Sequence, residues 1–307
     1  MKRSEFQSRT RFGFVLILTL TLLAALAQYG LAQQATGAIT GRITDPSGAI
    51  VAGATVIAKD ADRGTVWQTK TNEQGDYSLP SLPVGRYELR VEATGFQTAV
   101  HSPFALDLNQ TAKVDIALTI GETSSSVEVT VAGPVLQTQT TEVSTVMEAN
   151  AIANLPLETR NYQQLALLVP GAVTISPASF NTGQKTFNAA RPNLDGNREQ
   201  ANYYLLDGVE NTEFVDNNVA YSPNIDAIQE FSVITLNPSA EFGQFLGGVI
   251  NVSLMSGTNR FHGVAFEYLR NNFFNANEWS NNFNGLPTPK QRWNEFGATL
   301  GGPIKKY

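Results

Sequence analysis

Residues 87–92 read YELRVE, an alternation of apolar and charged side chains. Successive side chains of a β-strand point to opposite faces, so Tyr87, Leu89 and Val91 would share one apolar face. Residues 113–118 (KVDIAL) repeat the pattern. A period of two predicts strands that bury one face against a core.

The whole stretch 36–118 consists of short runs of this kind. The first run, Ile39 to Thr44, is followed by Asp45-Pro46-Ser47-Gly48, four residues that favour a turn. Apolar residues alternate again over 54–58, and no part of the stretch has helical periodicity. Short runs closed by turns predict a β-sandwich, and about 80 residues can bury a modest core.

A spaced series of glycines and aromatics accompanies these runs. Its members are Gly41, Asp45, Gly48, Gly53, Ala54, Thr71, Asn72, Gly75, Tyr77, Leu82, Gly85, Tyr87, Gly95 and Phe96. The series resembles the carboxypeptidase regulatory-like domain, a transthyretin-like sandwich of seven strands. The resemblance implies an accessory module without a peptidase site. Turn glycines and half-buried strand tyrosines explain the same residues without any function.

The chain starts with the features of an export signal. Lys2, Arg3, Arg9 and Arg11 precede an uncharged run from Phe12 to Ala27, and small residues follow. The run is shorter than the ~20 residues of a membrane-spanning helix, so we expect a cleaved signal peptide over 1–32 rather than an uncleaved anchor. The mature chain would begin near residue 33.

Charge and cysteine content limit the classes of function. The signal holds four basic residues and one acidic residue, so its removal takes the net charge from −6 to −9. No Lys/Arg cluster remains, which argues against nucleic acid as a partner. The chain has no cysteine, so an exported protein here is stabilised without disulfides. Its 307 residues suggest about two domains.

Residues 119–135 change character to a small polar linker followed by a strand-like piece. The piece that matters is Glu128, Val129, Thr130 and Val131. It is either one more strand of the sandwich or a peptide that an energy-coupling protein captures by strand addition.

Residues 136–257 interleave short helical and strand-like runs. Helical composition is found over 147–155, 161–169 and the start of 225–234, and strand-like composition over 205–209 and 247–252. Such interleaving with long connections predicts a small α/β domain with exposed loops.

A series of motifs in this region carries a second resemblance. The motifs are LPL (155–157), RN (160–161), Leu165, PG (170–171), NYYLLDGV (202–209), DAIQEF (226–231), AEFG (240–243), GGVINV (247–252) and SGTN (256–259). In this order they resemble the plug domains of TonB-dependent outer-membrane receptors, and with the sandwich in front, the Oar-like branch of that superfamily.

The resemblance implies a division of the chain into a sandwich (36–118), a linker with a TonB-box-like segment (119–135), a plug (136–257) and the start of a truncated barrel (258–307). It implies the coupling role for Glu128–Val131, although Thr130-Val131-Ala132 replaces a more usual valine-rich stretch. The plug motif residues are Leu206, Asp207, Gly208, Gly247, Gly248 and Asn251. The expected fold class is mainly β: a transthyretin-like sandwich, a small α/β plug and the first strands of an incomplete transmembrane β-barrel.

Two further alternating runs lie at the end of the chain. His262, Val264, Phe266 and Tyr268 would share one face of the first, and Phe296, Ala298 and Leu300 one face of the second. Apolar faces of this kind are typical of lipid-facing barrel positions, and the polar connection between 271 and 291 suits an extracellular loop. A plugged barrel has about 22 strands, and 260–307 suffices for about two to four, so we expect the front part of a barrel.

The sequence lacks a recognisable catalytic or metal-binding constellation. His101 and His262 are far apart, and no phosphate-binding or nucleophile motif is present. Asp207, Glu210, Glu213 and Asp216 do not have EF-hand spacing, and a solvated loop is their favoured interpretation. A final set could either stack on a glycan or a chelate or pack inside the fold: Tyr203, Tyr204, Phe214 and Tyr221.

The sequence therefore favours a TonB-dependent receptor of the outer membrane, not an enzyme, with the sandwich and plug on the periplasmic side. Its partners would be a TonB-type coupling protein, outer-membrane lipid and an unidentified substrate, which could be a siderophore, glycan, cobalamin or peptide; no cofactor or metal is expected. The alternative is a secreted or periplasmic binding module without a membrane role.

Overall fold

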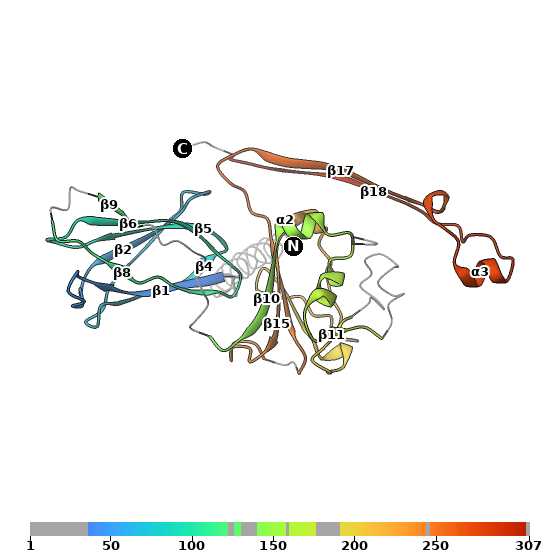
Figure 1. The fold of residues 1–307 in the computed structure, drawn as a ribbon, viewed down its shortest axis with the longest axis horizontal. Helices are drawn as coiled ribbons and strands as arrows, with labels where there is room; N and C mark the ends of the chain where they lie inside the picture. Colours follow the sequence, from blue (N-terminus) through green and yellow to red (C-terminus); the bar gives the residue numbers. More distant parts are fainter. Residues whose placement is uncertain are drawn as a thin grey trace, which may run out of the picture. The chain divides into compact units, whose positions relative to one another are not determined.

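The computed structural model describes residues 36–121, 126–129, 140–157, 160–175, 191–243 and 246–304. The chain divides into two compact units, residues 1–34 and 35–307, and every described residue belongs to the second. The expected signal peptide (1–32), residues 122–125 of the linker, and Thr130 and Val131 lie outside the described residues. The described part is mainly β, as predicted (Figure 1).

The first sheet of the sandwich is built around one central strand. Strand β1 (Thr36–Thr44) pairs antiparallel with β4 (Asp76–Pro83) and parallel with β7 (Thr111–Lys113) and β8 (Ile116–Ala117). Glycine is required at one point of β1, because a Cβ at Gly41 would collide with the carbonyl of Val114. That carbonyl accepts a hydrogen bond of 2.8 Å from the Tyr77 hydroxyl.

The second sheet has the strand order β3-β2-β5-β6-β9. Its strands are β3 (Val66–Lys70), β2 (Thr55–Asp60), β5 (Gly85–Glu92), β6 (Thr98–Leu106) and β9 (Ser126–Val129). Tyr87, Leu89 and Val91 of β5 are fully buried, as the alternation predicts. They belong to one core cluster with Ile39 and Ile43 of β1, so the two sheets pack face to face.

The middle domain (140–257) contains a five-stranded sheet of order β10-β15-β16-β13-β14. The strands are β10 (Val143–Glu148), β15 (Ile228–Leu236), β16 (Val249–Leu254), β13 (Tyr203–Leu206) and β14 (Val209–Glu210). Strands β13 and β16 are parallel, and the other pairs are antiparallel. A second core cluster lies here, with Phe231, Tyr162 and Leu165 among its buried members.

Short helices surround this sheet. They are α2 (Ala149–Asn154) and the 3-10 helices η2 (Tyr162–Leu168), η4 (Glu199–Ala201) and η5 (Ile225–Ala227); β11 (Ala172–Val173) and β12 (Asn193–Leu194) form a small two-stranded sheet. The helix expected from Met147 begins two residues later, because Met147 and Glu148 pair with Phe231 and Glu230 in the sheet. The helix expected over 161–169 is a 3-10 helix, with the Asn161 side chain accepting from the Gln163 amide at 3.0 Å.

The C-terminal hairpin consists of β17 (His262–Asn271) and β18 (Arg292–Gly301). Figure 1 shows it as one long ribbon whose connection carries η6 (Asn272–Phe274) and α3 (Trp279–Phe283), a helix that the polar composition of this connection did not predict. Among the residues that the structure describes, no helix is long and apolar enough to cross a membrane.

The register of this hairpin corrects one prediction. Phe266 lies opposite Gly297 and Tyr268 opposite Glu295, so these four residues share one face of the ribbon. Phe296, Ala298 and Leu300 therefore lie on the other face. The two apolar faces predicted to point the same way point in opposite directions, because alternation within a strand does not determine how it is aligned with its partner.

Candidate functional site

Asp207 and Gly208 form the tight turn between β13 and β14. Both have positive φ, 50° and 77°, the backbone that two-residue hairpin turns require. The Asp207 amide donates to the Val252 carbonyl at 2.8 Å, and the Asp207 carboxylate accepts from the Leu254 amide at 2.8 Å. Leu206, half-buried, packs against the core of the middle domain. These motif residues thus hold β13 to β16.

Gly247 and Gly248 lie where the chain enters β16. A Cβ at Gly247 would collide with the Asn202 side chain, and one at Gly248 with Leu194. Asn202 is buried; it accepts from the Gly248 amide at 3.2 Å and donates to the Pro192 carbonyl at 2.7 Å. The glycines permit close packing around this buried amide.

Asn251, the last of the predicted motif residues, is buried within β16. It pairs with Leu205 of β13 on one side and Ser232 of β15 on the other. The structure therefore brings Leu206, Asp207, Gly208, Gly247, Gly248 and Asn251 together along two neighbouring strands. Their contacts organise the sheet.

Arg160 joins the middle domain to the hairpin. It is buried, has φ of 51° and forms a 2.7 Å ion pair with Asp226. Its guanidinium carbon lies 3.8 Å from the centre of the Tyr268 ring, and its Nε lies 3.7 Å from Glu295. Arg160 therefore contacts the hairpin face that carries Tyr268 and Glu295, and that face is turned toward the middle domain. The sequence motif included Arg160, but not this role.

Arg191 is a second buried arginine, one that the sequence analysis did not single out. It pairs with Glu199 at 3.2 Å and with Asp216 at 3.1 Å. Glu213 accepts from the amides of Val215 and Asp216, and these hydrogen bonds lower the pKa of its carboxyl. Glu213 and Asp216 thus stabilise the middle domain through contacts of their own, and no group of potential metal ligands occurs among the described residues.

The candidate stacking aromatics separate into two kinds. Tyr204 is fully buried in the core of the middle domain, and Tyr203 is half-buried. Phe214 and Tyr221 are exposed, at 81% and 60% of their surface. Phe214 and Tyr221 are therefore the two of these rings that are mostly exposed. The histidines remain apart: His101 is buried in the sandwich and His262 is exposed in the hairpin.

The coupling segment lies at a sheet edge in its described part. Ser126–Val129 forms β9 and pairs parallel with Thr98–His101 of β6. The interpretation as a further strand of the sandwich is therefore correct for residues 126–129. It does not exclude capture by a partner, because β9 is the last strand of its sheet.

Glu230 is a buried carboxylate that contacts the loop between β6 and β7. Its Oε2 accepts from the Leu108 amide at 2.8 Å. Burial raises the pKa of Glu230 to about 7, the Leu108 hydrogen bond opposes the rise, and the charges of Asp107 and Glu148 add to it. Asp107 also has a raised pKa, mainly through burial.

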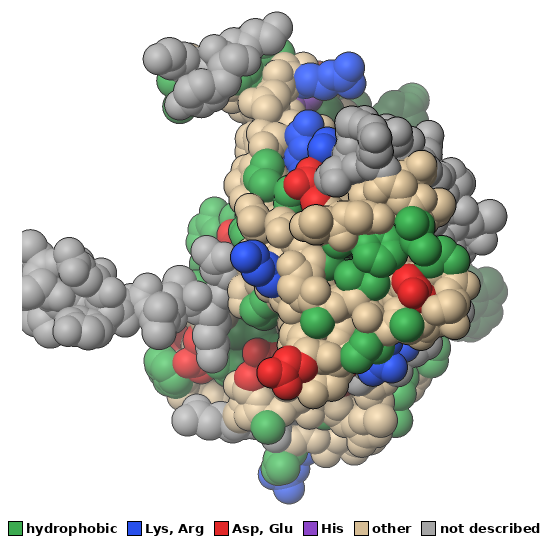
Figure 2. Space-filling view, turned by 90° about the vertical axis from the view of Figure 1, so that its left-hand side faces the viewer, with side chains coloured by type: hydrophobic (Ala, Val, Ile, Leu, Met, Phe, Trp, Pro, Cys, Tyr) green, Lys and Arg blue, Asp and Glu red, His purple; other side chains and the backbone are tan. Residues whose placement is uncertain are grey.

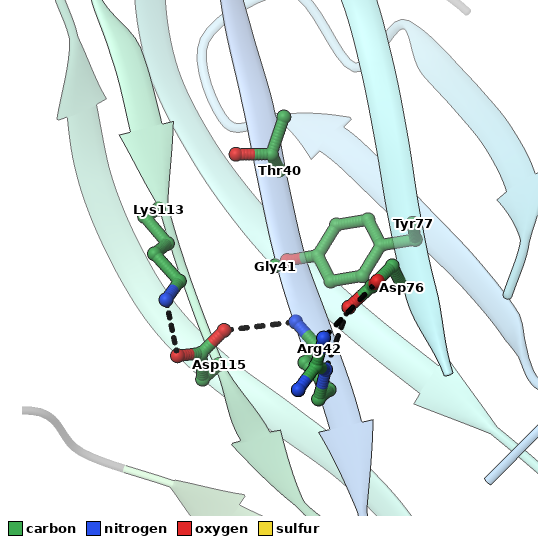
Figure 3. A pocket seen from close by; sticks show the side chains of 7 residues that line it. All are labelled: Thr40, Gly41, Arg42, Asp76, Tyr77, Lys113 and Asp115. Carbon is green, nitrogen blue, oxygen red and sulfur yellow. Dashed lines mark hydrogen bonds and ion pairs between the residues drawn. The ribbon is translucent and has the colours of Figure 1, made fainter. Parts of the chain in front are cut away.

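One surface hollow of about 340 Å³ lies on the first sheet of the sandwich (Figure 3). Arg42 pairs with Asp76 at 2.7 Å, and Lys113 pairs with Asp115 at 3.3 Å. The opposite charges neutralise each other within the hollow. Figure 2 likewise shows acidic and basic side chains interspersed on the face in view. Neither feature indicates a site for an ionic ligand.

Known proteins match the two ends of the described region. Residues 38–119 match the family model of the carboxypeptidase regulatory-like domain, and residues 253–307 match that of an outer membrane beta barrel domain. The chain is 30% identical over 252 residues to the TonB-dependent transporter Oar of Myxococcus xanthus, which covers 77% of this chain. The chain spans only 22% of that transporter's length.

Two solved outer-membrane proteins are also similar. The outer membrane transporter YddB of Escherichia coli is 17% identical with a TM-score of 0.39, over 51% of this chain and 23% of its own. The siderophore receptor PirA of Acinetobacter baumannii is 19% identical with a TM-score of 0.38, over 53% of this chain and 22% of its own. The family matches and the Oar alignment identify the chain as an outer-membrane protein related to the Oar-like TonB-dependent receptors, with a carboxypeptidase regulatory-like domain.

Proposed function

We propose that the chain is the front portion of an energy-coupled outer-membrane transporter. The middle domain acts as the plug, which the sequence predicts over 136–257, residues 258–307 form the first barrel strands, and the sandwich lies on the periplasmic side. The observation that carries this proposal is the Oar alignment, which runs through 77% of the chain. The contact of Arg160 with Tyr268 and Glu295 supports it, since a plug must be attached to the barrel wall.

The proposed mechanism is mechanical. A TonB-type coupling protein adds a strand to residues 128–131 and pulls, and the load passes along the chain into β10 at the edge of the middle sheet. Displacing an edge strand disturbs fewer hydrogen bonds than displacing a central one. No covalent chemistry and no cofactor is required.

The substrate is a bulky solute that the plug would otherwise exclude, and siderophores, glycans, cobalamin and peptides are the candidate classes. Phe214 and Tyr221 are exposed on the loops of the plug and are candidates for contact with it. The alternative, a secreted or periplasmic binding module, requires a soluble mature protein.

Fractionation of native cells tests the proposal against this alternative. An antibody against residues 36–118 should detect a heat-modifiable band in the outer membrane, well above 33.2 kDa. A soluble periplasmic or secreted band at or below that mass would replace the transporter by the binding module.

The coupling role is tested by Val129→Pro in the full receptor. Proline removes a ladder donor, so the purified periplasmic domain of the host's coupling protein should no longer bind. Val129→Ala keeps the amide donor and should retain binding. If the Val129→Pro variant binds as well as the Val129→Ala variant and the unsubstituted receptor, this segment is not the one captured.

A further inference from the structure

The turn that joins β6 to β7, residues 107–110, is held in one shape by its own hydrogen bonds. The Gln110 amide donates to the Asp107 carbonyl at 3.2 Å, and the Asp107 amide donates to the Gln110 side chain at 2.9 Å. Asn109 has a φ of 60°, a value that tight turns often place at their third residue. The sandwich therefore presents this turn to its surroundings in a preformed state.

The turn contacts the middle sheet on the face opposite Phe231. The Leu108 amide donates to Glu230 Oε2 at 2.8 Å, and Asn251 Nδ2 donates to Asn109 Oδ1 at 3.5 Å. Glu230 and Asn251 share that face, because both alternate with residues of the core cluster. Among the described residues the sandwich core does not include Leu108, which is nevertheless only 1% exposed. We infer that Leu108 is buried at this contact.

A second turn of the sandwich contacts the chain just before β17. The Asn259 amide donates to the Asp62 carbonyl at 3.2 Å, and the Asn259 side chain donates to the Arg63 carbonyl at 2.7 Å. The turn between β2 and β3 is itself fixed by the buried Asp60, whose carboxylate accepts from the amides of Asp62 and Arg63 at 2.8 Å. The sandwich thus touches the middle domain at its sheet and at the segment that leads into the hairpin.

Both contacts are polar, and the first is incompletely satisfied. Within the described part of the chain, the buried atoms Asn109 Nδ2 and Asn251 Oδ1 have no hydrogen-bond partner. Water can supply these hydrogen bonds once the surfaces separate, which lowers the cost of separation. The contacts therefore suit a domain that docks and leaves again better than one that is fixed permanently.

The charges at the first contact also oppose docking. Asp107 of the turn and Glu148 of β10 act on Glu230, and Ser253, its neighbour in β16, is uncharged. No described basic side chain forms an ion pair with any of the three carboxylates. Burial and these charges raise the pKa of Glu230 to about 7, against the effect of the Leu108 hydrogen bond. Docking is therefore favoured while Glu230 is protonated and weakens as the pH rises through about 7.

Resting on the proposed role of the middle domain as a plug, we propose that the sandwich is a releasable lid on the polar face of the plug sheet, and that ionisation of Glu230 releases it. While docked, the lid covers Glu230 and holds the segment before β17 through Asn259. Once released, it opens the polar face to water and frees that segment. The sandwich thereby makes the restraint on the plug depend on the surrounding pH.

Thiol labelling of the buried turn position tests the lid. The chain has no cysteine, so Leu108→Cys in the full receptor introduces a single thiol and keeps the backbone amide that donates to Glu230. Its labelling rate with a maleimide is divided by that of a receptor with Glu73→Cys, an exposed position, at the same pH. This ratio should rise about tenfold from pH 6 to pH 8, because the docked state alone holds the raised pKa.

Two substitutions should change this ratio in different ways. Glu230→Gln keeps an acceptor for the Leu108 amide and carries no charge, so labelling should stay slow at both pH values. Asn259→Ala removes the hydrogen bond to the Arg63 carbonyl and should speed labelling at both. Arg260→Ala, at the exposed neighbouring position, is its control and should change neither rate.

A thiol within the sandwich core separates release from unfolding. Leu106 lies two residues before Leu108 and is fully buried in that core. Leu106→Cys should therefore remain unlabelled at pH 6 and at pH 8, since release of the lid leaves the sandwich folded.

Three results would overturn the lid. Labelling of Leu108→Cys as fast as that of Glu73→Cys at both pH values would mean that the sandwich does not dock. Labelling as slow as that of Leu106→Cys at both would mean that it is not released. An equal rise with pH in the receptor that carries Glu230→Gln would remove Glu230 as the trigger. Recovery of the receptor from the soluble fraction would instead refute the transporter, and with it the plug that the lid covers.

Discussion

Glu230 is a carboxylate that folding removes from water. It belongs to the DAIQEF motif, but the sequence could not show that its side chain turns toward the loop carrying Leu108. Burial raises its pKa to about 7, so the folded state binds this proton more tightly than the unfolded chain does. The contribution of Glu230 to stability is therefore most favourable at acid pH and is lost as the pH rises from its ordinary value through about 7.

Glu230→Gln should remove this pH dependence. The amide keeps an acceptor for the Leu108 amide and carries no charge, so at pH 8 the variant should be more stable than the wild type by about 3 kcal/mol at most. Urea unfolding at pH 5 and pH 8 measures the difference. Glu73→Gln, at an exposed turn position, is the control and should change neither value. If the wild type gained stability relative to Glu230→Gln between pH 5 and pH 8, the assignment would be contradicted.

Arg160 illustrates a different limit of sequence analysis at the same scale. Its partner Asp226 lies 66 residues away, and Tyr268 and Glu295 lie in another element. Nothing local to Arg160 encodes these contacts. By contrast, the turn at Asp207-Gly208 is encoded locally, because these two residue types tolerate positive φ. Local backbone requirements were predictable, and long-range pairing of charges was not.

At the scale of elements, the period-two pattern predicted both hairpin strands. It did not predict which face of the paired strands is directed away from the middle domain. In β18 the burial alternates, with Glu295, Gly297 and Thr299 partly covered and Phe296 and Ala298 exposed. Phe296 and Ala298 lie on the face of the hairpin opposite the one that contacts Arg160. We therefore expect the lipid-facing side of the hairpin to be the one that carries Phe296, Ala298 and Leu300.

Lysine substitution at neighbouring positions should separate the two faces. Ala298→Lys places a charge on the lipid side and should cost about 2–4 kcal/mol near the bilayer centre, whereas Thr299→Lys points inward and should cost less. The measurement is the yield of heat-modifiable, membrane-assembled receptor, with unfolding in lipid vesicles as a second readout. Greater damage from Thr299→Lys than from Ala298→Lys would reverse the assignment of faces.

The pairing of β9 with β6 belongs to this scale too. Its strand character was predictable from composition, yet the sequence allowed two partners for it, the sandwich and a coupling protein. Backbone pairing carries almost no sequence signature, which is why the choice of β6 as its neighbour could not be predicted.

At the scale of the whole molecule, the described chain has separate hydrophobic cores. The sandwich buries Ile39 in one cluster, and the middle domain buries Phe231 in another. The order of these parts was predictable, because turn spacing and motif order follow the chain. The helix α3 was not, because its short, asparagine-rich segment gave no clear amphipathic period.

Separate cores predict separate unfolding. Ile39→Ala should destabilise the sandwich by about 2–5 kcal/mol and leave the middle domain unchanged, and Phe231→Ala should do the reverse at about 3–5 kcal/mol. Calorimetry or urea titration of the mature protein should show two transitions, each sensitive to one variant. A single transition shifted equally by both variants would show that the two cores unfold as one unit.

The exposed aromatic surface of the hairpin has a consequence for biogenesis. Phe296 and Leu300 are 79% and 86% exposed, and an isolated two-stranded hairpin is only marginally stable in water. The sandwich closes its core within residues 39–118, so its folding does not depend on the hairpin. The newly made protein would then reach the outer membrane with a folded sandwich and an unfolded, aggregation-prone hairpin segment. A holding chaperone would bind that segment until lipid replaces it.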